Sequence, residues 1–213
     1  MYRGGLTVSE HYYSKKPQTE SKPRHWNFTL LGHNFRFETD AGVFSKSEVD
    51  FGSRVLIDAF EEPKLEGDIL DVGCGYGPIG LSLAKTWKDR TIHLVDVNTR
   101  AIQLAEKNAA ANGIQNVRIY ESDGLSAVST ANFAAIVTNP PIRAGKETIF
   151  RFYRESYEKL ASKGELWVVI QKKQGAPSTF SYLEEIFGQV EVVNKEKGYW
   201  IIKATKIDLT NSL

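Results

Sequence analysis

The residues best suited to chemistry are Asn139, Pro140 and Pro141, which follow the apolar run 133–138. Proline lacks the N–H that a strand ladder needs, so the pair ends the strand and leaves backbone carbonyls without strand partners. The side-chain oxygen of Asn139 is a further acceptor. A rigid pair of acceptors at a strand end suits an NH2 group that must give up a hydrogen. We therefore predict that Asn139 and the Pro140 carbonyl are catalytic in a transfer reaction on an amine, with a donor site nearby.

A glycine-rich loop follows the apolar segment 68–72 and reads Asp71-Val-Gly73-Cys74-Gly75-Tyr-Gly77-Pro-Ile-Gly80. Glycines there let the backbone approach a ligand closely with positive φ. Gly75, Gly77 and Gly80 satisfy the dinucleotide fingerprint, so NAD is one candidate ligand. Asp71 favours another, because a carboxylate is poorly placed for the pyrophosphate that binds a helix N-terminus. S-adenosylmethionine has no phosphate and carries an ammonium and a sulfonium, so we predict it as the methyl donor.

Further carboxylates follow the next two strands, at the strand ends where open α/β sheets bind ligands. We expect Asp96, with Val97 beside it, to accept from ribose hydroxyls, and Asp123 with Gly124 to meet the adenine amine. For each Asp the alternative is a turn or helix-cap role. Cys74 is interpreted as a small filler of the loop and not as a nucleophile. The predicted cofactor contacts are Asp71, Gly73, Cys74, Gly75, Gly77, Asp96, Val97, Asp123, Gly124 and Asn139.

Strand and helix patterns alternate from residue 68 onward. Strands are expected at 68–72, 91–97, 117–121, 133–138, 165–171, 190–193 and 199–203, and helices at 78–87, 99–112, 146–160 and 178–187, with a short helical stretch at 125–130. This alternation predicts an α/β fold with a doubly wound, seven-stranded Rossmann-like sheet that is mostly parallel. The last two strands are separated only by Lys197-Gly198, so they should form an antiparallel hairpin.

Residues 1–60 are expected to form an N-terminal extension packed on a core domain at 61–213. A β-hairpin is predicted over 26–37, turning at 32–34. Ser47-Glu-Val-Asp50 is typical of a capping box that opens a helix, which Pro63 would end. Residues 1–37 carry six basic and two acidic side chains, which allows contact with a polyanion, although a solvated tail explains the charge equally well.

The composition favours a single-domain protein without disulfides, a metal site or a membrane span. The chain has 213 residues, of which 41% are hydrophobic, enough for one domain with a full core. It has one cysteine, which excludes an intrachain disulfide, and its four histidines lack ligand spacing, so no metal is predicted. No apolar run approaches the ~20 residues of a membrane span, and the N-terminus lacks an apolar signal region. We therefore expect a cytoplasmic protein that does not contact membranes; the sequence does not indicate its oligomeric state.

The chain resembles the class I S-adenosylmethionine-dependent methyltransferases with a small methyltransferase domain, including the guanine-N2 methyltransferases of small-subunit ribosomal RNA. The similarity covers about residues 12–203 and rests on His11-Tyr-Tyr-Ser14, Gly42-Val-Phe-Ser45, Asp50-x-Gly-Ser53, the 71–77 loop, Asp96-Val-Asn98, Ser122-Asp-Gly124 and Asn139-Pro-Pro-Ile142. It implies methyl transfer to an exocyclic amine, guanine N2 in the first place, with ribosomal RNA or a small-subunit particle as the partner.

The resemblance breaks at Ile142, where relatives that methylate such nitrogens commonly have Tyr or Phe to stack on the target base. Phe44 would supply an aromatic surface instead, or else pack in the core. Lys146 opens a helix, where a cation opposes the macrodipole, so it either contacts phosphate or is solvated. The predicted substrate contacts are Phe44, Pro141, Ile142, Arg143 and Lys146. Adenine N6 of nucleic acid and a protein glutamine are alternative targets. A non-catalytic RNA-binding module and an NAD-dependent oxidoreductase are alternatives of other classes.

Overall fold

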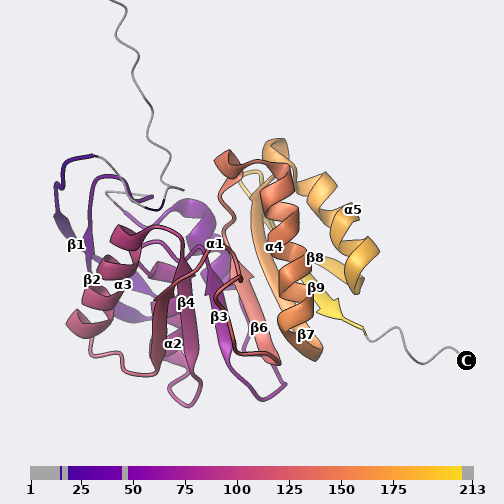
Figure 1. Ribbon diagram of the computed structural model, residues 1–213, viewed down its shortest axis with the longest axis horizontal. Helices are drawn as coiled ribbons and strands as arrows, with labels where there is room; N and C mark the ends of the chain where they lie inside the picture. Colours follow the sequence, from indigo (N-terminus) through magenta and orange to yellow (C-terminus); the bar gives the residue numbers. More distant parts are fainter. Residues whose placement is uncertain (1–14, 16–18, 45–47, 208–213) are drawn as a thin grey trace, which may run out of the picture.

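The computed structural model describes residue 15 and residues 19–44 and 48–207, which form a large sheet between two layers of helices and a small hairpin beside it (Figure 1). The strands are β1 (Arg24–Leu30), β2 (His33–Thr39), β3 (Ile69–Val72), β4 (Ile92–Asp96), β5 (Val117–Glu121), β6 (Phe133–Thr138), β7 (Leu160–Gln171), β8 (Gly188–Glu196) and β9 (Tyr199–Lys206). The helices are α1 (Phe51–Ala59), α2 (Pro78–Thr86), α3 (Thr99–Ala111), α4 (Lys146–Lys159) and α5 (Ala176–Phe187), with short 3-10 turns η1 (Ile142–Ala144) and η2 (Lys172–Gln174).

The large sheet has the strand order β5-β4-β3-β6-β7-β9-β8. Strands β3 to β7 are joined by parallel pairings, whereas β9 is antiparallel to both β7 and β8. From β3 the chain first builds outward through β4 and β5, then crosses to β6 and β7 on the other side. The seven-stranded, mostly parallel sheet with an antiparallel hairpin at its C-terminal end is therefore confirmed.

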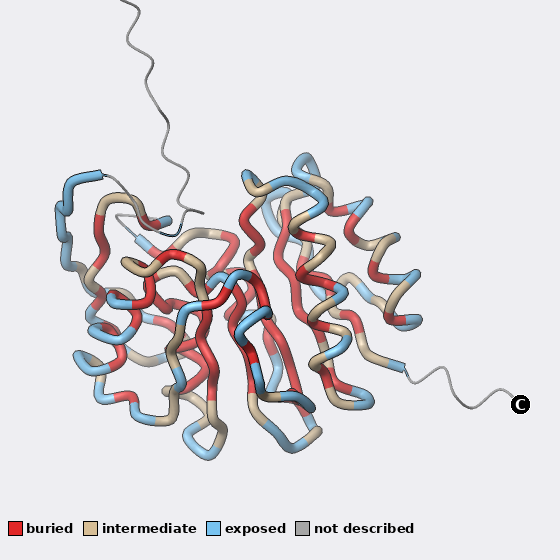
Figure 2. Tube along the Cα trace, in the orientation of Figure 1, coloured by how far each residue is buried: buried red, intermediate tan, exposed pale blue. Residues whose placement is uncertain are grey.

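Alternating side chains of the strands divide the core into two layers, as expected for a sheet covered on both faces. Ile69 and Leu94 belong to the cluster that holds α1, α2, α3 and the small hairpin. Leu70 and Val95 belong to the cluster that holds α4 and α5. Figure 2 shows the result, a sheet that is buried through its centre and exposed mainly at its loops.

The hairpin turns through Leu31 and Gly32, and not at 32–34 as predicted. Leu30 pairs with His33, and the two loop residues have φ of 48° and 75°. Two successive positive φ angles define the tight turn whose twist matches the flanking strands, which explains why the loop is this short.

Helix α1 begins at Phe51, so the capping-box prediction is wrong in its position. Asp50 is the N-cap and accepts a hydrogen bond from the Ser53 backbone N–H at 3.0 Å. Ser47 lies outside the described residues. The helix ends at Ala59, before Pro63, because Phe60 turns into extended backbone and packs its ring on Trp167 at 5.1 Å.

Two further expectations need correction. Residues 125–130 are not helical: a turn over 124–127 runs into irregular chain at 128–130. The Ser122 hydroxyl donates to Gly124 O and accepts from Ala127 N, which closes the backbone locally. Strand β7 begins at Leu160, five residues earlier than predicted, because Leu160 pairs with Phe133 before the alternating pattern begins.

The N-terminal hairpin is held by two asparagines of α3 that act as a substitute for a neighbouring strand. Asn108 accepts from Glu38 N at 2.7 Å and donates to Glu38 O and Tyr76 O at 3.0 and 2.9 Å. Asn112 exchanges two hydrogen bonds of 2.9 Å with Arg36. One turn of helix separates the two side chains, so both reach the edge of β2.

The hairpin, α1, α2 and α3 share one continuous core cluster that crosses residue 60. The division into an extension at 1–60 and a core at 61–213 stays a prediction. No helix within the described part of the chain combines the length and the apolar character that a membrane crossing requires.

Replacing Asn108 by Ala is expected to reduce the free energy of unfolding by about 3 kcal/mol, because it leaves the buried Tyr76 carbonyl and the half-buried N–H and carbonyl of Glu38 without their partner. Urea denaturation would measure it. Asn112→Ala is the matched control: its bonds to Arg36 are exposed, so water replaces them and the loss should be about 1 kcal/mol. Equal losses in the two variants would contradict the role given to burial.

Candidate active site

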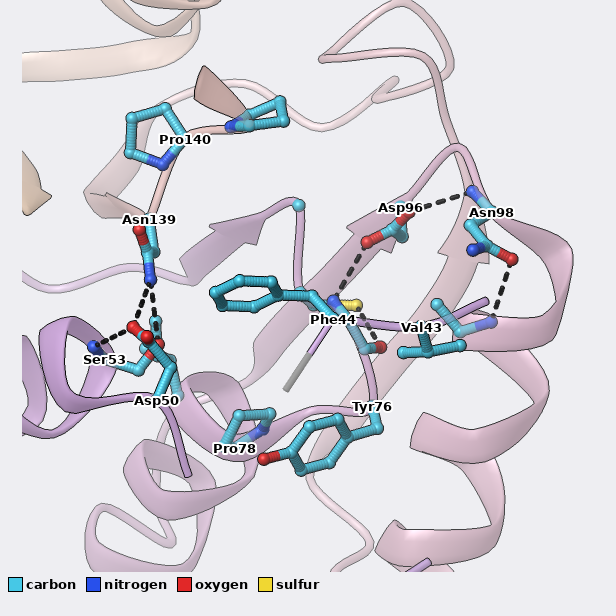
Figure 3. A pocket seen from close by; sticks show the side chains of 16 residues that line it. Val43, Phe44, Asp50, Ser53, Tyr76, Pro78, Asp96, Asn98, Asn139 and Pro140 are labelled. Carbon is cyan, nitrogen blue, oxygen red and sulfur yellow. Dashed lines mark hydrogen bonds between the residues drawn. The ribbon is translucent and has the colours of Figure 1, made fainter. Parts of the chain in front are cut away.

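A cavity opens where β3, β4 and β6 end, at the point where the strand order reverses. Open α/β sheets bind ligands at such a switch point, because the following helices depart to opposite faces. Figure 3 shows the cavity, which is lined by Val43, Phe44, Asp50, Ser53, Gly73, Cys74, Gly75, Tyr76, Pro78, Ile79, Asp96, Asn98, Ala101, Asn139, Pro140 and Pro141. The structure therefore brings the glycine loop and the Asn-Pro-Pro segment together.

The glycine loop needs its glycines for conformation. Gly73, Gly75 and Gly77 have φ of 74°, 57° and 101°, in the left-handed region that side chains disfavour. Gly77 is the N-cap of α2, and a Cβ there would lie 2.8 Å from Leu81. Cys74 is buried, and burial raises the pKa of its thiol well above the usual value, which supports the interpretation of a filler that is not a nucleophile.

Asp71 lies beneath the loop and does not line the cavity. Its carboxylate is fully buried and accepts the Gly80 N–H at 2.8 Å, which ties the end of β3 to the first turn of α2. Its second oxygen is buried without a hydrogen-bond partner among the described residues. Burial raises the pKa of Asp71 to about 7. A buried carboxylate of this kind is costly unless a cation lies nearby.

Asp96 lines the cavity at the end of β4. Its carboxylate accepts from Gly75 N at 2.9 Å and from Asn98 N at 2.8 Å, and burial raises its pKa to about 6. Asn98 lines the cavity as well and caps α3 by accepting from Arg100 N and Ala101 N. Asn98 was not predicted as a site residue, although the Asp96-Val-Asn98 motif contained it. Val97 lies beside Asp96 but does not line the cavity.

Asp123 and Gly124 lie outside this cavity. The Asp123 carboxylate is ion-paired with Arg151 of α4 at 2.7 Å. Gly124 has a φ of 57°, and a Cβ there would lie 2.6 Å from the ring of Phe152. Their contact with adenine stays a prediction, in which the Asp123 carboxylate would accept from the amine as well as from Arg151.

Asn139 is held in one orientation by the start of α1 (Figure 3). Its Nδ2 donates to Asp50 Oδ2 and to Ser53 Oγ, both at 3.0 Å. A carboxylate can only accept, so the nitrogen of the amide must face Asp50, and Oδ1 points the other way. The Asn139 oxygen is thereby fixed as an acceptor at the cavity wall. Asp50 and Ser53 were not predicted as site residues, although the Asp50-x-Gly-Ser53 motif contained them, and Asp50 was otherwise interpreted only as part of a capping box.

The predicted substrate residues separate into two groups. Phe44 and Pro141 line the cavity, and Phe44 is 41% exposed, so the alternative that it packs in the core is wrong. Ile142 is half-buried and packs against the core cluster of α4 and α5. Arg143 and Lys146 are exposed on η1 and the first turn of α4, outside the cavity. The roles of these last three residues stay predictions.

The family model of the methyltransferase small domain matches residues 34–203. The chain belongs to the methyltransferase small domain family. The uncharacterized protein YbxB of Bacillus subtilis (strain 168) is 61% identical over 201 residues, which are 94% of this chain and all of that protein. The ribosomal RNA small subunit methyltransferase C of Vibrio cholerae (El Tor Inaba N16961) is 34% identical over 179 residues, which are 82% of this chain and 51% of the relative.

Solved structures of methyltransferases share the fold of this chain. The 16S rRNA N2 methyltransferase RsmC of T. thermophilus, solved with AdoMet and guanosine, superposes with a TM-score of 0.78 at 28% identity. The match covers 89% of this chain and 52% of that one. A Pyrococcus furiosus methyltransferase, at 17% identity and a TM-score of 0.62, shares the fold. The chain thus spans about half the length of the ribosomal RNA methyltransferases that it matches.

Replacing Asp71 by Asn tests the buried carboxylate. With a pKa of about 7 in the folded protein and about 3.8 in the unfolded chain, Asp71 binds a proton on folding between these values. The wild type should therefore lose stability relative to Asp71→Asn as pH rises from about 4 to 7, by up to about 4 kcal/mol. Urea denaturation at a series of pH values measures the difference; one that does not change with pH would contradict it.

Proposed function

We propose that this protein transfers a methyl group from S-adenosylmethionine to an exocyclic amine, guanine N2 of small-subunit ribosomal RNA. The observation that carries the proposal is the fixed amide of Asn139, which presents an acceptor oxygen across the cavity from the glycine loop. The ribosomal RNA methyltransferases among the relatives support the choice of RNA, and the RsmC structure with AdoMet and guanosine supports the choice of base.

The residues of the cavity fit S-adenosylmethionine better than a dinucleotide. The described residues that line it carry two carboxylates, Asp50 and Asp96, and no Lys or Arg. The unpartnered Asp71 oxygen lies buried beneath the loop, and a cationic ligand above it would favour the charged form of this carboxyl. Pyrophosphate is repelled by such surroundings, whereas a ligand with an ammonium and a sulfonium is attracted. When bound, S-adenosylmethionine would supply an electrophilic methyl group, and Asp96 would accept from its ribose hydroxyls.

The amine clamp, which we define as Asn139 Oδ1 and the Pro140 carbonyl, would accept the two hydrogens of the guanine amine. The lone pair of this amine is delocalised into the ring, and holding both hydrogens favours the pyramidal form in which the lone pair is free to attack. A carbon–nitrogen bond then forms as the carbon–sulfur bond breaks, and the extra proton leaves to water. Alignment of the reactants supplies up to roughly 7–11 kcal/mol of the barrier reduction.

Asp50 strengthens the clamp because its negative charge lies behind the Asn139 amide. The amide donates to this carboxylate at 3.0 Å, which polarises it and makes Oδ1 a better acceptor. Positive charge develops on the amine nitrogen during transfer, so an acceptor that is oriented beforehand stabilises the transition state more than the ground state.

Phe44 favours a nucleobase over a protein glutamine. It is exposed at the cavity wall beside Asn139 and Pro140, whereas Ile142 lies outside the cavity. An aromatic ring can stack on a flat base, which is the usual way in which unpaired RNA bases are held. Adenine N6 has the same NH2 group and the same flat ring, so it stays the alternative target.

Replacing Asn139 by Ala is expected to lower the rate of methyl transfer by about 100-fold or more, because one acceptor at the developing charge is removed. The affinity for S-adenosylmethionine, measured by calorimetry, should change little. Equal losses of cofactor affinity and rate would place Asn139 in cofactor binding and contradict the clamp.

The substrate is tested by incubating the protein with labelled S-adenosylmethionine and separate RNA, DNA and protein fractions, followed by nucleoside analysis. Label in N2-methylguanosine from small-subunit RNA is the expected result. Label in N6-methyladenine or in glutamine would establish the alternative targets. Binding of RNA and cofactor without any transfer would establish the non-catalytic module.

A reciprocal exchange tests the orientation of the Asn139 amide. Asp50→Asn lets the amide turn over, and Asn139→Asp places two carboxylates side by side, so each single variant should lose at least about tenfold in rate. The double variant restores one donor facing one acceptor, and it should recover most of the rate. If the double variant were as slow as the worse single variant, a role of Asp50 in orienting Asn139 would be excluded.

A further inference from the structure

A second feature lies at the same edge of the sheet, beyond the Asn-Pro-Pro segment. It is a groove lined by Gln171, Lys172, Lys173, Pro177, Lys197 and Gly198. The groove is formed by η2 and the β8–β9 turn, which a hydrogen bond of 2.8 Å from Lys172 N to Gly198 O holds together. We call Lys172, Lys173 and Lys197 the lysine groove.

The lysine groove is strongly positive. Its three lysines are exposed, and none of the described residues that line it has a carboxylate. Within the described part of the chain, none of the three takes part in an ion pair, although seven pairs of a Lys or Arg with a carboxylate occur elsewhere in it. Lys195, near the end of β8, is a fourth exposed cation, and its ammonium lies 4.2 Å from the centre of the Trp200 ring. Its neighbour Glu196 is also exposed, so lysines outnumber carboxylates here.

The groove lies close to the amine clamp because of the strand order. Strand β7 is the direct neighbour of β6, and Thr138 pairs with Val168. Gln171 is three residues farther along, so at a rise of about 3.3 Å per residue it lies about 10 Å beyond the end of β6. Gln171 in turn pairs with Tyr199 of β9.

Aromatic and basic side chains fill the interval between groove and clamp. The Lys197 ammonium lies 4.6 Å from the centre of the Phe51 ring, which packs at 5.6 Å on the ring of Tyr199. Arg54 lies over the same Phe51 ring, with its guanidinium 5.2 Å from the ring centre. Phe51 directly follows Asp50, which holds Asn139. Basic side chains interleaved with rings are typical of surfaces that bind single-stranded nucleic acid.

We infer that the lysine groove binds the phosphate backbone of single-stranded RNA next to the nucleotide whose base enters the cavity. This inference rests on the proposed function, since it takes the target amine to belong to an RNA base. The described residues that line the cavity include two carboxylates and no Lys or Arg, so we place the phosphate backbone elsewhere. The three lysines of the groove, about 10 Å beyond the end of β6, are suited to bind this backbone. Phosphate contacts of this kind position a substrate without reading its sequence.

The test exchanges charge at the groove and, as a control, at the opposite edge of the sheet. The groove variant is Lys172→Gln, Lys173→Gln, Lys197→Gln. The control variant is Lys64→Gln, Lys88→Gln, Lys163→Gln, whose lysines are likewise exposed but lie in the loops before β3 and β4 and near the start of β7. The change of charge is the same in both. Binding of a fluorescein-labelled single-stranded oligoribonucleotide is followed by anisotropy over a range of salt concentrations.

The groove variant should bind this RNA at least about tenfold more weakly at low salt, and the slope of log K against log salt should fall by about 2. The control variant should bind like the wild type. Melting temperature and affinity for S-adenosylmethionine show whether each variant is folded. Equal weakening in both variants, or none in the groove variant, would overturn the inference.

The same experiment separates this inference from the proposed function. If RNA binding depends on the groove but no guanine in any RNA is methylated, the groove is supported and the proposed substrate fails. If guanine is methylated while RNA binding does not depend on the groove, the proposed function is supported and the groove fails. If the wild type binds an acidic peptide through these lysines but no RNA, the partner is a protein and the inference is overturned.

Discussion

The site depends on the parallel pairing of β3 with β6 at the centre of the sheet. Val72 and Thr138 are partners in this pairing, and the Thr138 hydroxyl donates to Val72 O at 2.9 Å just before both strands end. Because adjacent strands are about 4.8 Å apart, the first residues beyond them, Gly73 and Asn139, must lie close together. One strand end therefore carries the ligand loop and the next carries the clamp. The α-helices that follow leave to opposite faces, which opens the cavity between them.

The parts added to this pairing serve both folding and chemistry. Asp50 caps α1 and also holds the Asn139 amide, so the same carboxylate stabilises a helix and orients an acceptor. Asn108 of α3 binds the edge of β2 and the carbonyl of Tyr76 in the glycine loop. The small hairpin is thus connected directly to the wall of the cavity, through Tyr76, which packs against Phe37 at 5.5 Å. The sheet alone would need neither the Asp50–Asn139 bond nor the Asn108–Tyr76 bond.

Much of this architecture could be predicted from the sequence, because the strands and helices from β3 onward have clear apolar periods and the loops carry glycine or proline. The glycine loop, Asp96 and the Asn-Pro-Pro segment could be recognised for the same reason, since each is local in sequence. The contacts that hold them are not local. Asp50 and Asn139 are 89 residues apart, and Asp123 meets Arg151 across 28. No periodicity reports such pairs. The sequence therefore predicted Asp50 as part of a capping box and Asp123 as an adenine contact or a cap, but not the contacts of these residues with Asn139 and Arg151.

Negative and positive side chains are separated at this end of the sheet, and this separation would orient a bound nucleic acid. Carboxylates surround the cavity where a cationic methyl donor fits, while exposed lysines lie about 10 Å farther along β7 and β9. A nucleic acid backbone is repelled by the first region and attracted by the second, so only an uncharged base is free to enter the cavity. The clamp lies between the two regions, with its amide held by Asp50 on the acidic side. In the proposed reaction, electrostatics alone would then present the amine to the donor and keep the phosphates away from it, without any contact that reads the sequence of the RNA.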